Sequence, residues 1–353
     1  MERIFITTLV PKDSEIEDRV SIAACNFSRN LMTGRYFDKV YSIPAVYIHQ
    51  IFDCDDEVQY MTSYIRKCGY LFKYIAPIFE QMKLFFKIPK NSSVWFYNLS
   101  TLNCLLFLLL RTFKHSVLLN VIVLDFTPGA KFNNYFLKLI NKCHGIITLA
   151  DNSLFINKNK CCIPGVVPND SLFWPVVEKP IVKKFLLSGS MSEQISQVSK
   201  ILEVFSKLSK CQLYIIGKID NFELLKKYSK FTNIIFHEKL LWKDYLDLLH
   251  NCPFVLSTRD VNAPENQCNF PSKIIESLLH NRIVVSTINY KQLSEIKILK
   301  VDNEVHQMFK DFEKIEAISD QELIIYANQS DKIKQLFNVS VWGKSIKQIE
   351  ERY

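Results

Sequence analysis

The most informative stretch of this sequence is NFPSKIIESLLHNRIVVST, residues 269–287. Pro271 suits the first turn of a helix because proline has no N–H group to leave unbonded, and Ser272 or Asn269 can cap that helix. Apolar residues then recur at helical spacing, and 283–285 is a short apolar run typical of a buried strand. The stretch therefore predicts a loop, a helix and a strand in succession.

Two charged side chains share one face of the expected helix. Lys273 falls in its first turn, where the helix dipole disfavours a cation, and Glu276 follows one turn later. A lysine in that position indicates a nearby anion, such as a diphosphate held by the ammonium and by free backbone N–H groups. Glu276 can then accept the hydroxyls of a ribose. The alternative is a solvated Lys–Glu pair on an ordinary helix.

Apolar runs alternate with helical segments through the C-terminal half of the chain. The expected strands of this half are 185–187, 213–216, 234–236, 254–256, 283–285 and 298–299. Such alternation implies a parallel sheet with helices on both faces, and right-handed crossovers favour a Rossmann-like domain. The N-terminal half shows the pattern less clearly, with strands expected at 4–10, 94–97, 117–124 and 146–149 and a helix at 132–140. Four prolines between Pro164 and Pro180 indicate an interdomain linker.

The composition is that of a globular protein with apolar material for two cores. The chain has 353 residues, of which 48% are hydrophobic and 23% charged. Its ten cysteines form no C-x-x-C pair and no zinc-finger spacing, which indicates a reducing cytoplasm. The first residues lack the apolar length of a signal peptide, and the most apolar run, 105–110, is far too short to span a bilayer. We expect it to form a buried helix in a cytoplasmic protein.

Most of the net charge of +8 lies in one segment. Residues 61–120 contain eight basic residues and one acid, Glu80, and aromatic residues interleave with the basic ones. One interpretation is contact with an anionic membrane, in which Lys and Arg meet the headgroups while aromatic side chains enter the interface. The other is a pair of core helices with snorkelling lysines on the outer face. Nucleic-acid binding is disfavoured because no known recognition motif occurs.

The stretch 269–287 resembles the donor-site motif of GT-B glycosyltransferases of the glycosyl transferases group 1 type, the retaining enzymes of bacterial capsule and O-antigen clusters. In that family a Pro-Ser-Lys-x-x-Glu helix precedes a strand. Segments 186–192, 213–217 and 234–257 are similar to the strands and loops of its donor domain. The resemblance implies an α/β fold of GT-B type, with two Rossmann-like domains facing each other across a cleft. We expect an acceptor-binding domain at 1–170, a nucleotide-sugar-binding domain at 171–335 and a helix at 336–353 that packs back on the first.

The resemblance also implies the roles of individual residues in the donor site. Lys273 is expected to bind donor phosphate and Glu276 the ribose. The other expected phosphate-binding residues are Ser272, Arg259 and the turn Ser188-Gly189-Ser190, and the donor loop is Asn269, Phe270 and Pro271. Arg259 is included because the family usually has a basic residue in the loop near Ser188 and this chain has none before Gln194. A surface arginine is the alternative.

A carboxylate in the N-terminal half is the candidate catalytic residue. Asp125 follows the expected strand 117–124, and ligands of open parallel sheets lie at the carboxyl ends of the strands. It could accept a proton or stabilise an oxocarbenium-like state. The alternative is a turn-forming Asp before Thr-Pro-Gly. Many retaining relatives also carry two glutamates seven residues apart, but Cys268 stands at the first position here and Glu265 is out of register.

The sequence thus predicts a hexosyltransferase that moves a sugar from a UDP- or GDP-sugar to a glycan or polyprenyl-diphosphate-linked acceptor in surface polysaccharide synthesis. The resemblance implies retention of configuration. We expect no cofactor, and no metal ion because a lysine and helix N-termini can neutralise the leaving diphosphate. The expected location is the cytoplasm, at the inner face of the membrane if the basic segment docks there. A GT-B nucleotide-sugar epimerase and a non-catalytic GT-B-like partner protein are the alternatives.

Overall fold

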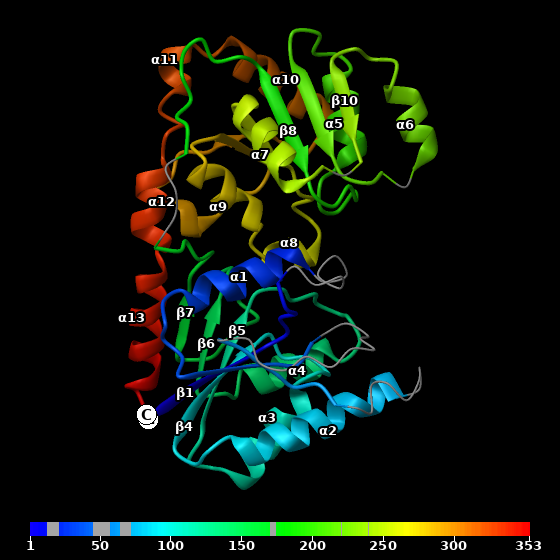
Figure 1. Cartoon of the computed structure of the whole chain (residues 1–353). Coiled ribbons are helices and arrows are strands. Elements are labelled where there is room, and N and C mark those ends of the chain that lie inside the picture. The colour runs from blue at the N-terminus through cyan, green and yellow to red at the C-terminus, as the bar shows by residue number, and fades with distance from the viewer. Residues whose placement is uncertain (13–20, 45–56, 64–71, 170–173, 220, 239) are drawn as a thin grey trace. The chain divides into compact units, whose positions relative to one another are not determined.

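The computed structural model describes residues 1–12, 21–44, 57–63, 72–169, 174–219, 221–238 and 240–353. The chain divides into two compact units (Figure 1). The N-terminal unit consists of Met1–Ser171 together with Phe337–Tyr353, and the C-terminal unit of Leu172–Leu336. Each unit contains a parallel sheet of its own, which confirms the expected α/β class.

The sheet of the N-terminal unit has the order β3-β2-β1-β4-β5-β6-β7, and all its neighbouring strands are parallel. Its strands are β1 (Glu2–Thr7), β2 (Lys39–Ser42), β3 (Gln59–Tyr60), β4 (Ser92–Tyr97), β5 (Leu118–Val123), β6 (Gly145–Thr148) and β7 (Lys160–Cys162). Every residue of β4 is buried, because strands in the middle of a parallel sheet are covered on both faces. The first six strands follow the Rossmann order, which reverses between β1 and β4.

The helices of the N-terminal unit are α1 (Ile22–Met32), α2 (Phe72–Lys87), α3 (Cys104–Phe113), α4 (Asn133–Ile140) and α13 (Val339–Glu350). The run 105–110 lies in α3 and buries Leu106, Phe107 and Leu110, so the expectation of a buried helix is confirmed. Among the described residues, no helix is both long enough and apolar enough to cross a membrane.

The last helix, α13, belongs to the N-terminal unit by its buried contacts. Trp342 is fully buried and its indole Nε1 donates to the carbonyl oxygen of Gly165 at 2.8 Å. Glu350 accepts hydrogen bonds from Arg3 Nε at 2.7 Å and from Trp95 Nε1 at 3.1 Å.

The sheet of the C-terminal unit has the order β10-β9-β8-β11-β12-β13 and is also wholly parallel. Its strands are β8 (Lys184–Ser188), β9 (Gln212–Ile216), β10 (Ile234–His237), β11 (Phe254–Ser257), β12 (Ile283–Ser286) and β13 (Leu299–Lys300). Each of them covers or overlaps an apolar run expected to be a strand. Counted from β8, this is again the Rossmann order, and it reverses between β8 and β11.

Helices of the C-terminal unit cover both faces of this sheet. They are α5 (Val198–Phe205), α6 (Phe222–Tyr228), α7 (Trp242–Asn251), α8 (Pro264–Cys268), α9 (Ser272–Leu279), α10 (Val305–Ala317), α11 (Asp320–Leu323) and α12 (Ser330–Phe337), with a 3-10 turn at Lys291–Leu293. Phe185 of β8 packs into one core cluster with Phe205 and Phe312, and its neighbour Leu186 packs into another with Leu249. Successive side chains of a strand point to opposite faces, so the two clusters lie on the two sides of the sheet.

Candidate functional site

Helix α9 begins at Ser272, and its N-cap residue is Pro271. Pro271 was expected inside the first turn, so this placement is a correction of one position. Pro271 makes no side-chain cap, and neither Ser272 nor Asn269 occupies the N-cap position as expected. The reason for the difference is that the extended backbone of Pro271 already leads into the helix, and Ser272 is exposed at its tip. The N-cap residue thus provides no side-chain acceptor for the backbone N–H groups at this tip.

Lys273 and Glu276 form a pair, as their spacing allows, and a third residue joins them. Lys273 Nζ lies 3.1 Å from Glu276 Oε2 and donates to Tyr245 Oη at 2.9 Å. The same ammonium lies 4.4 Å from the centroid of the Tyr245 ring. Burial alone would lower the pKa of Lys273, but Glu276 and Tyr245 outweigh burial and raise it. Lys273 is therefore a cation throughout the neutral range.

Tyr245 is a candidate site residue that the sequence reasoning missed. It lies in α7, is 7% exposed and packs with Leu186 and Leu249 in one core cluster of the C-terminal unit. Burial raises the pKa of its phenol and Glu276 raises it further, so the hydroxyl keeps its proton at neutral pH. Trp242, one turn earlier on α7, stacks on its ring at 5.4 Å and is itself 58% exposed. The sequence signal that could have identified Tyr245 is its spacing from Trp242, since the two aromatic residues lie one helical turn apart.

Ser188 ends β8 and comes close to the same tyrosine. Its hydroxyl is near enough to lower the pKa of Tyr245 slightly, yet it is buried and makes no hydrogen bond of normal geometry. The structure thus brings Ser188, Lys273 and Glu276 together around Tyr245. Sequence reasoning named three of these four residues, although the contact joining them was not foreseen.

The turn after Ser188 is shaped by two glycines. Gly189 has a φ of +115°, and a Cβ placed on it would meet nothing within 4 Å. Gly217, after β9, has a φ of +152°, and a Cβ there would lie 2.3 Å from the carbonyl oxygen of Gly189. Gly217 is therefore required for the two loops to pack, whereas the space beside Gly189 and the exposed Ser190 is open.

Arg259 is held by a different set of contacts. Its backbone N–H donates to Thr287 Oγ1 at 2.8 Å, and its Nη1 donates to Asn266 Oδ1 at 3.0 Å. Asn266 in turn donates to the carbonyl oxygens of Gln194 and Asp260 at 2.7 and 2.9 Å. Arg259 follows β11, beside the point where the strand order reverses, but the contacts that hold Lys273 are made by other residues.

The donor loop is packed into the protein rather than projecting from it. Phe270 is 4% exposed and meets the ring of Tyr290 edge-on at 4.9 Å. Cys268 is buried, and burial followed by the charge of Glu265 raises its pKa to about 11. The thiol is therefore neutral and cannot take the place of a glutamate. Among the described residues, no three His, Cys, Asp or Glu side chains are grouped so as to hold a metal ion.

Asp125 lies in the N-terminal unit, exposed and two residues beyond the end of β5. Its charge raises the pKa of Tyr97, which burial has already raised, so the two side chains are close at the carboxyl ends of β4 and β5. Asn98, at a φ of +46°, accepts a hydrogen bond from the backbone N–H of Leu124 at 2.8 Å. This contact fixes the start of the loop that carries Asp125. Tyr97 was not singled out from the sequence.

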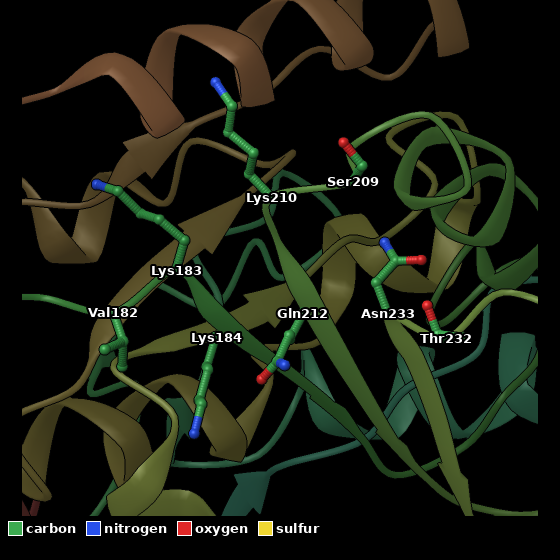
Figure 2. Close-up of a pocket in the computed structure, with 8 residues that line it drawn as sticks. All are labelled: Val182, Lys183, Lys184, Ser209, Lys210, Gln212, Thr232 and Asn233. Carbon is green, nitrogen blue, oxygen red and sulfur yellow. The ribbon is translucent and has the colours of Figure 1, made fainter.

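A pocket in the C-terminal unit lies at the other end of its strands. Figure 2 shows its lining, which includes Lys184 and Gln212, the first residues of β8 and β9. Neither Ser188 nor Lys273 lines this pocket. Ligands of parallel sheets lie at the carboxyl ends, so the residues around Tyr245 are the better candidate site.

Comparison with known proteins supports the fold. No family model matches the sequence, and no curated protein matches it significantly. An α,α-trehalose-phosphate synthase (UDP-forming) from Burkholderia vietnamiensis superposes with a TM-score of 0.70 at 8% identity, covering 99% of this chain and 98% of that one. The E. coli structure described as trehalose-6-phosphate bound with UDP-2-fluoro glucose gives 0.69 at 8% identity over 99% of both chains. TarM gives 0.58 at 14% identity over 76% of this chain and 57% of that one.

These solved structures belong to GT-B glycosyltransferases. At such low identity the likeness concerns the fold alone, and by that measure the expectation of a GT-B fold is confirmed. A role in capsule or O-antigen synthesis is not shown by it.

Proposed function

We propose that the chain is a glycosyltransferase that takes its sugar from a nucleotide-diphosphate donor held by the C-terminal unit. The observation that carries the proposal is the contact of Lys273 with both Glu276 and the buried Tyr245, next to Ser188 at the carboxyl end of β8. The fold supports it, because solved structures with that fold include a UDP-forming synthase and one bound to UDP-2-fluoro glucose.

The contacts around Lys273 suit a diphosphate. An ammonium has three N–H donors, of which one serves Tyr245 and one Glu276, so a third can serve a phosphate oxygen. The backbone N–H groups at the tip of α9, to which the N-cap residue Pro271 offers no side-chain acceptor, suit an anion as well. On donor binding, Glu276 would exchange the ammonium for the hydroxyls of the ribose. Positive charge held in place before the reaction favours the departing diphosphate, where negative charge develops.

The reaction proposed is transfer with retention, without a metal ion or cofactor. The bond between the anomeric carbon and the phosphate oxygen breaks, and its electron pair leaves with the diphosphate. The acceptor hydroxyl attacks from the same face and forms the new bond, while its proton passes to the departing phosphate oxygen. Asp125 would orient that hydroxyl or stabilise the positive charge on the sugar. Arg259, Ser190 and Ser272 are proposed as further contacts of the phosphates.

The finer parts of the proposal concern substrates and place. We take the donor to be a UDP- or GDP-sugar and the acceptor to be a glycan or a polyprenyl-diphosphate-linked glycan in surface polysaccharide synthesis. A lipid-linked acceptor would place the enzyme at the inner face of the cytoplasmic membrane.

A donor-binding screen tests the central claim. Thermal unfolding is measured with UDP, GDP and CMP, first for the wild type and then for Lys273→Ala and Glu276→Ala. One nucleoside diphosphate should raise the unfolding temperature of the wild type, and both substitutions should remove most of that rise. The matched control is Glu223→Ala with Lys226→Ala, which changes an i,i+3 pair in α6 of the same unit. An equal rise in all variants would contradict the proposal.

Turnover tests the role of Asp125 separately. Release of nucleoside diphosphate from UDP- and GDP-sugars should fall in Asp125→Asn while nucleotide binding stays unchanged. Undiminished release in this variant would remove Asp125 from the mechanism and leave the donor site standing.

A further inference from the structure

The outer face of α2 is unusually apolar for a solvent-facing helix. Its exposed large residues are Ile75, Ile78, Phe79, Met82 and Phe86, with exposed fractions between 36% and 75%. At 3.6 residues per turn they fall within an arc of about 100°, so they form one continuous stripe. Phe113, at the end of α3, is also 66% exposed and extends the stripe through its contact with Phe85.

The opposite face of α2 is fully occupied by the protein. Leu84 is buried, and the buried Gln81 accepts a hydrogen bond from the backbone N–H of Leu106 in α3 at 3.0 Å. The buried Glu80 accepts from the backbone N–H of Ser63 at 2.8 Å. Figure 1 shows α2 and α3 side by side, and the two helices pack on each other. The interpretation as a core helix pair therefore holds for the inner face and leaves the outer stripe unexplained.

Basic residues flank the stripe. Lys83, Lys87 and Lys90 are exposed, and Arg111 is exposed on α3. Lys114 has a different role, because its ammonium donates to the carbonyl oxygen of Phe85 at 2.6 Å and to that of Ile88. From 72 to 117 the only acidic residue is Glu80, which is buried on the inner face. Among the described residues of α2 and α3, the exposed side chains of this outer face are therefore apolar or positively charged and none is acidic.

We propose that this face of α2 docks on an anionic lipid membrane, with the stripe in the interface and the lysines at the headgroups. The positive charge decides between occupants. In a symmetric contact between two copies of the chain, the same lysines would face each other and repel. A lipid surface with negative headgroups instead matches both the apolar and the charged components. This inference concerns a surface outside the donor site and does not depend on the chemistry proposed there.

The expected strength follows from the two components. A lysine close to an anionic surface is worth about a fivefold change in partitioning, so neutralising three of them should weaken binding on the order of a hundredfold. Removing two exposed phenylalanines should weaken it by a further large factor, about tenfold for each ring that enters the interface. Binding should also fall at high salt, because the headgroup attraction is screened.

Vesicle flotation with the full chain tests the proposal. The wild type is mixed with vesicles of phosphatidylcholine alone and with vesicles of phosphatidylcholine and phosphatidylglycerol. We expect binding to the second kind only. Two variants, Phe79→Ser with Phe86→Ser and Lys83→Glu with Lys87→Glu, should each lose most of it. Both change exposed positions, so their unfolding temperatures should match the wild type and exclude misfolding as the cause.

A matched control comes from α6, where Phe222 is 71% exposed and is followed by Lys226 and Lys227 in the last turn. Phe222→Ser with Lys226→Glu should leave vesicle binding unchanged. Failure of the wild type to float with anionic vesicles would overturn the proposal, as would equal flotation of the α2 variants. A dimer in solution that Phe79→Ser with Phe86→Ser dissociates would also overturn it, because the occupant would then be a second copy. UDP or GDP binding is measured on the same samples, so the two proposals can fail independently.

Discussion

Replacing Lys273 with Met separates a binding lysine from an ordinary surface ion pair. The Lys273 side chain is 35% exposed and that of Glu276 is 24% exposed, so solvent screens their attraction. Such a pair contributes at most about 1 kcal/mol to stability. Met keeps an unbranched side chain but removes the ammonium that donates to the buried Tyr245 hydroxyl, and a buried hydroxyl left without its partner costs about 1–3 kcal/mol. Without ligand, Lys273→Met should therefore lose no more than about 3 kcal/mol of stability.

The change that identifies a binding lysine should appear in donor binding. A charge-assisted hydrogen bond to a phosphate is worth about 1.5–3 kcal/mol. Losing about 2 kcal/mol raises the Kd for UDP or GDP roughly 30-fold. At a nucleotide concentration about 100 times the wild-type Kd, the wild type gains about 2.7 kcal/mol of stability and the variant only about 0.9 kcal/mol. For a unit of this size that is a rise of about 5–11 °C against about 2–4 °C.

Thermal unfolding with and without nucleotide measures both quantities, and calorimetric titration gives the Kd directly. Lys226→Met in α6 is the control, since it removes a lysine from another helix of the same unit. If Lys273→Met keeps the full rise shown by the wild type, the ammonium does not touch the donor and the reasoning fails. A loss of stability well above about 3 kcal/mol without nucleotide would also refute it, because Lys273 would then be part of the core.

Three further outcomes are expected. Tyr245→Phe keeps the ring beneath Lys273 but removes the hydroxyl that accepts from it. Titration calorimetry should therefore show nucleotide binding weakened about 3- to 10-fold. The control Tyr214→Phe removes a hydroxyl that bonds Gln212, and it should bind nucleotide as the wild type does. Gly217→Ala should lower the free energy of unfolding in urea by about 2–3 kcal/mol, because the added Cβ meets the carbonyl oxygen of Gly189. Gly129→Ala should lower it by only about 1 kcal/mol, because Gly129 has a φ of +78° but its added Cβ would meet no other atom. Equal losses would contradict the role given to Gly217. Burial lowers the pKa of His280 to about 3, below its value in the unfolded chain. The neutral imidazole therefore contributes fully to folding stability above about pH 6.5, and this contribution is lost as the pH falls toward 3. His280→Gln should flatten that part of the curve of stability against pH, and an unchanged slope would refute the assignment.

The strands that could be predicted from the sequence are those that are buried on both faces of their sheet. All strands of the C-terminal unit were expected, because runs such as 283–285 are fully buried and therefore apolar throughout. The strands β2, β3 and β7 were missed. Their sequences, KVYS, QY and KCC, are short and lack an apolar run. Pairing with β1, β2 and β6, respectively, fixes them rather than their own pattern. Local pattern cannot show that kind of stabilisation.

The candidate site was predictable only in part, for a similar reason. Lys273 and Glu276 are one turn apart, so their proximity follows from helical spacing. Tyr245 meets Lys273 from 28 positions away, and only the packing of α7 against α9 brings the two together. Of the basic segment expected to contact a membrane, Arg66 and Lys67 lie outside the described residues, whereas the outer face of α2 became evident once the burial of its inner face was known.

The strongest reason to regard Lys273 as more than half of a surface pair is the nature of its third partner. A solvated Lys–Glu pair gains nothing from a buried phenol, and Tyr245 loses hydration by being buried, so its hydroxyl needs a partner. Here that hydroxyl accepts from the ammonium and sits beside Ser188, whose own hydroxyl is buried without a regular hydrogen bond. Polar groups from β8, α7 and α9 thus converge beside the open space at Gly189, next to the strand reversal where ligands of such sheets bind. A binding site accounts for this convergence, and a surface ion pair does not.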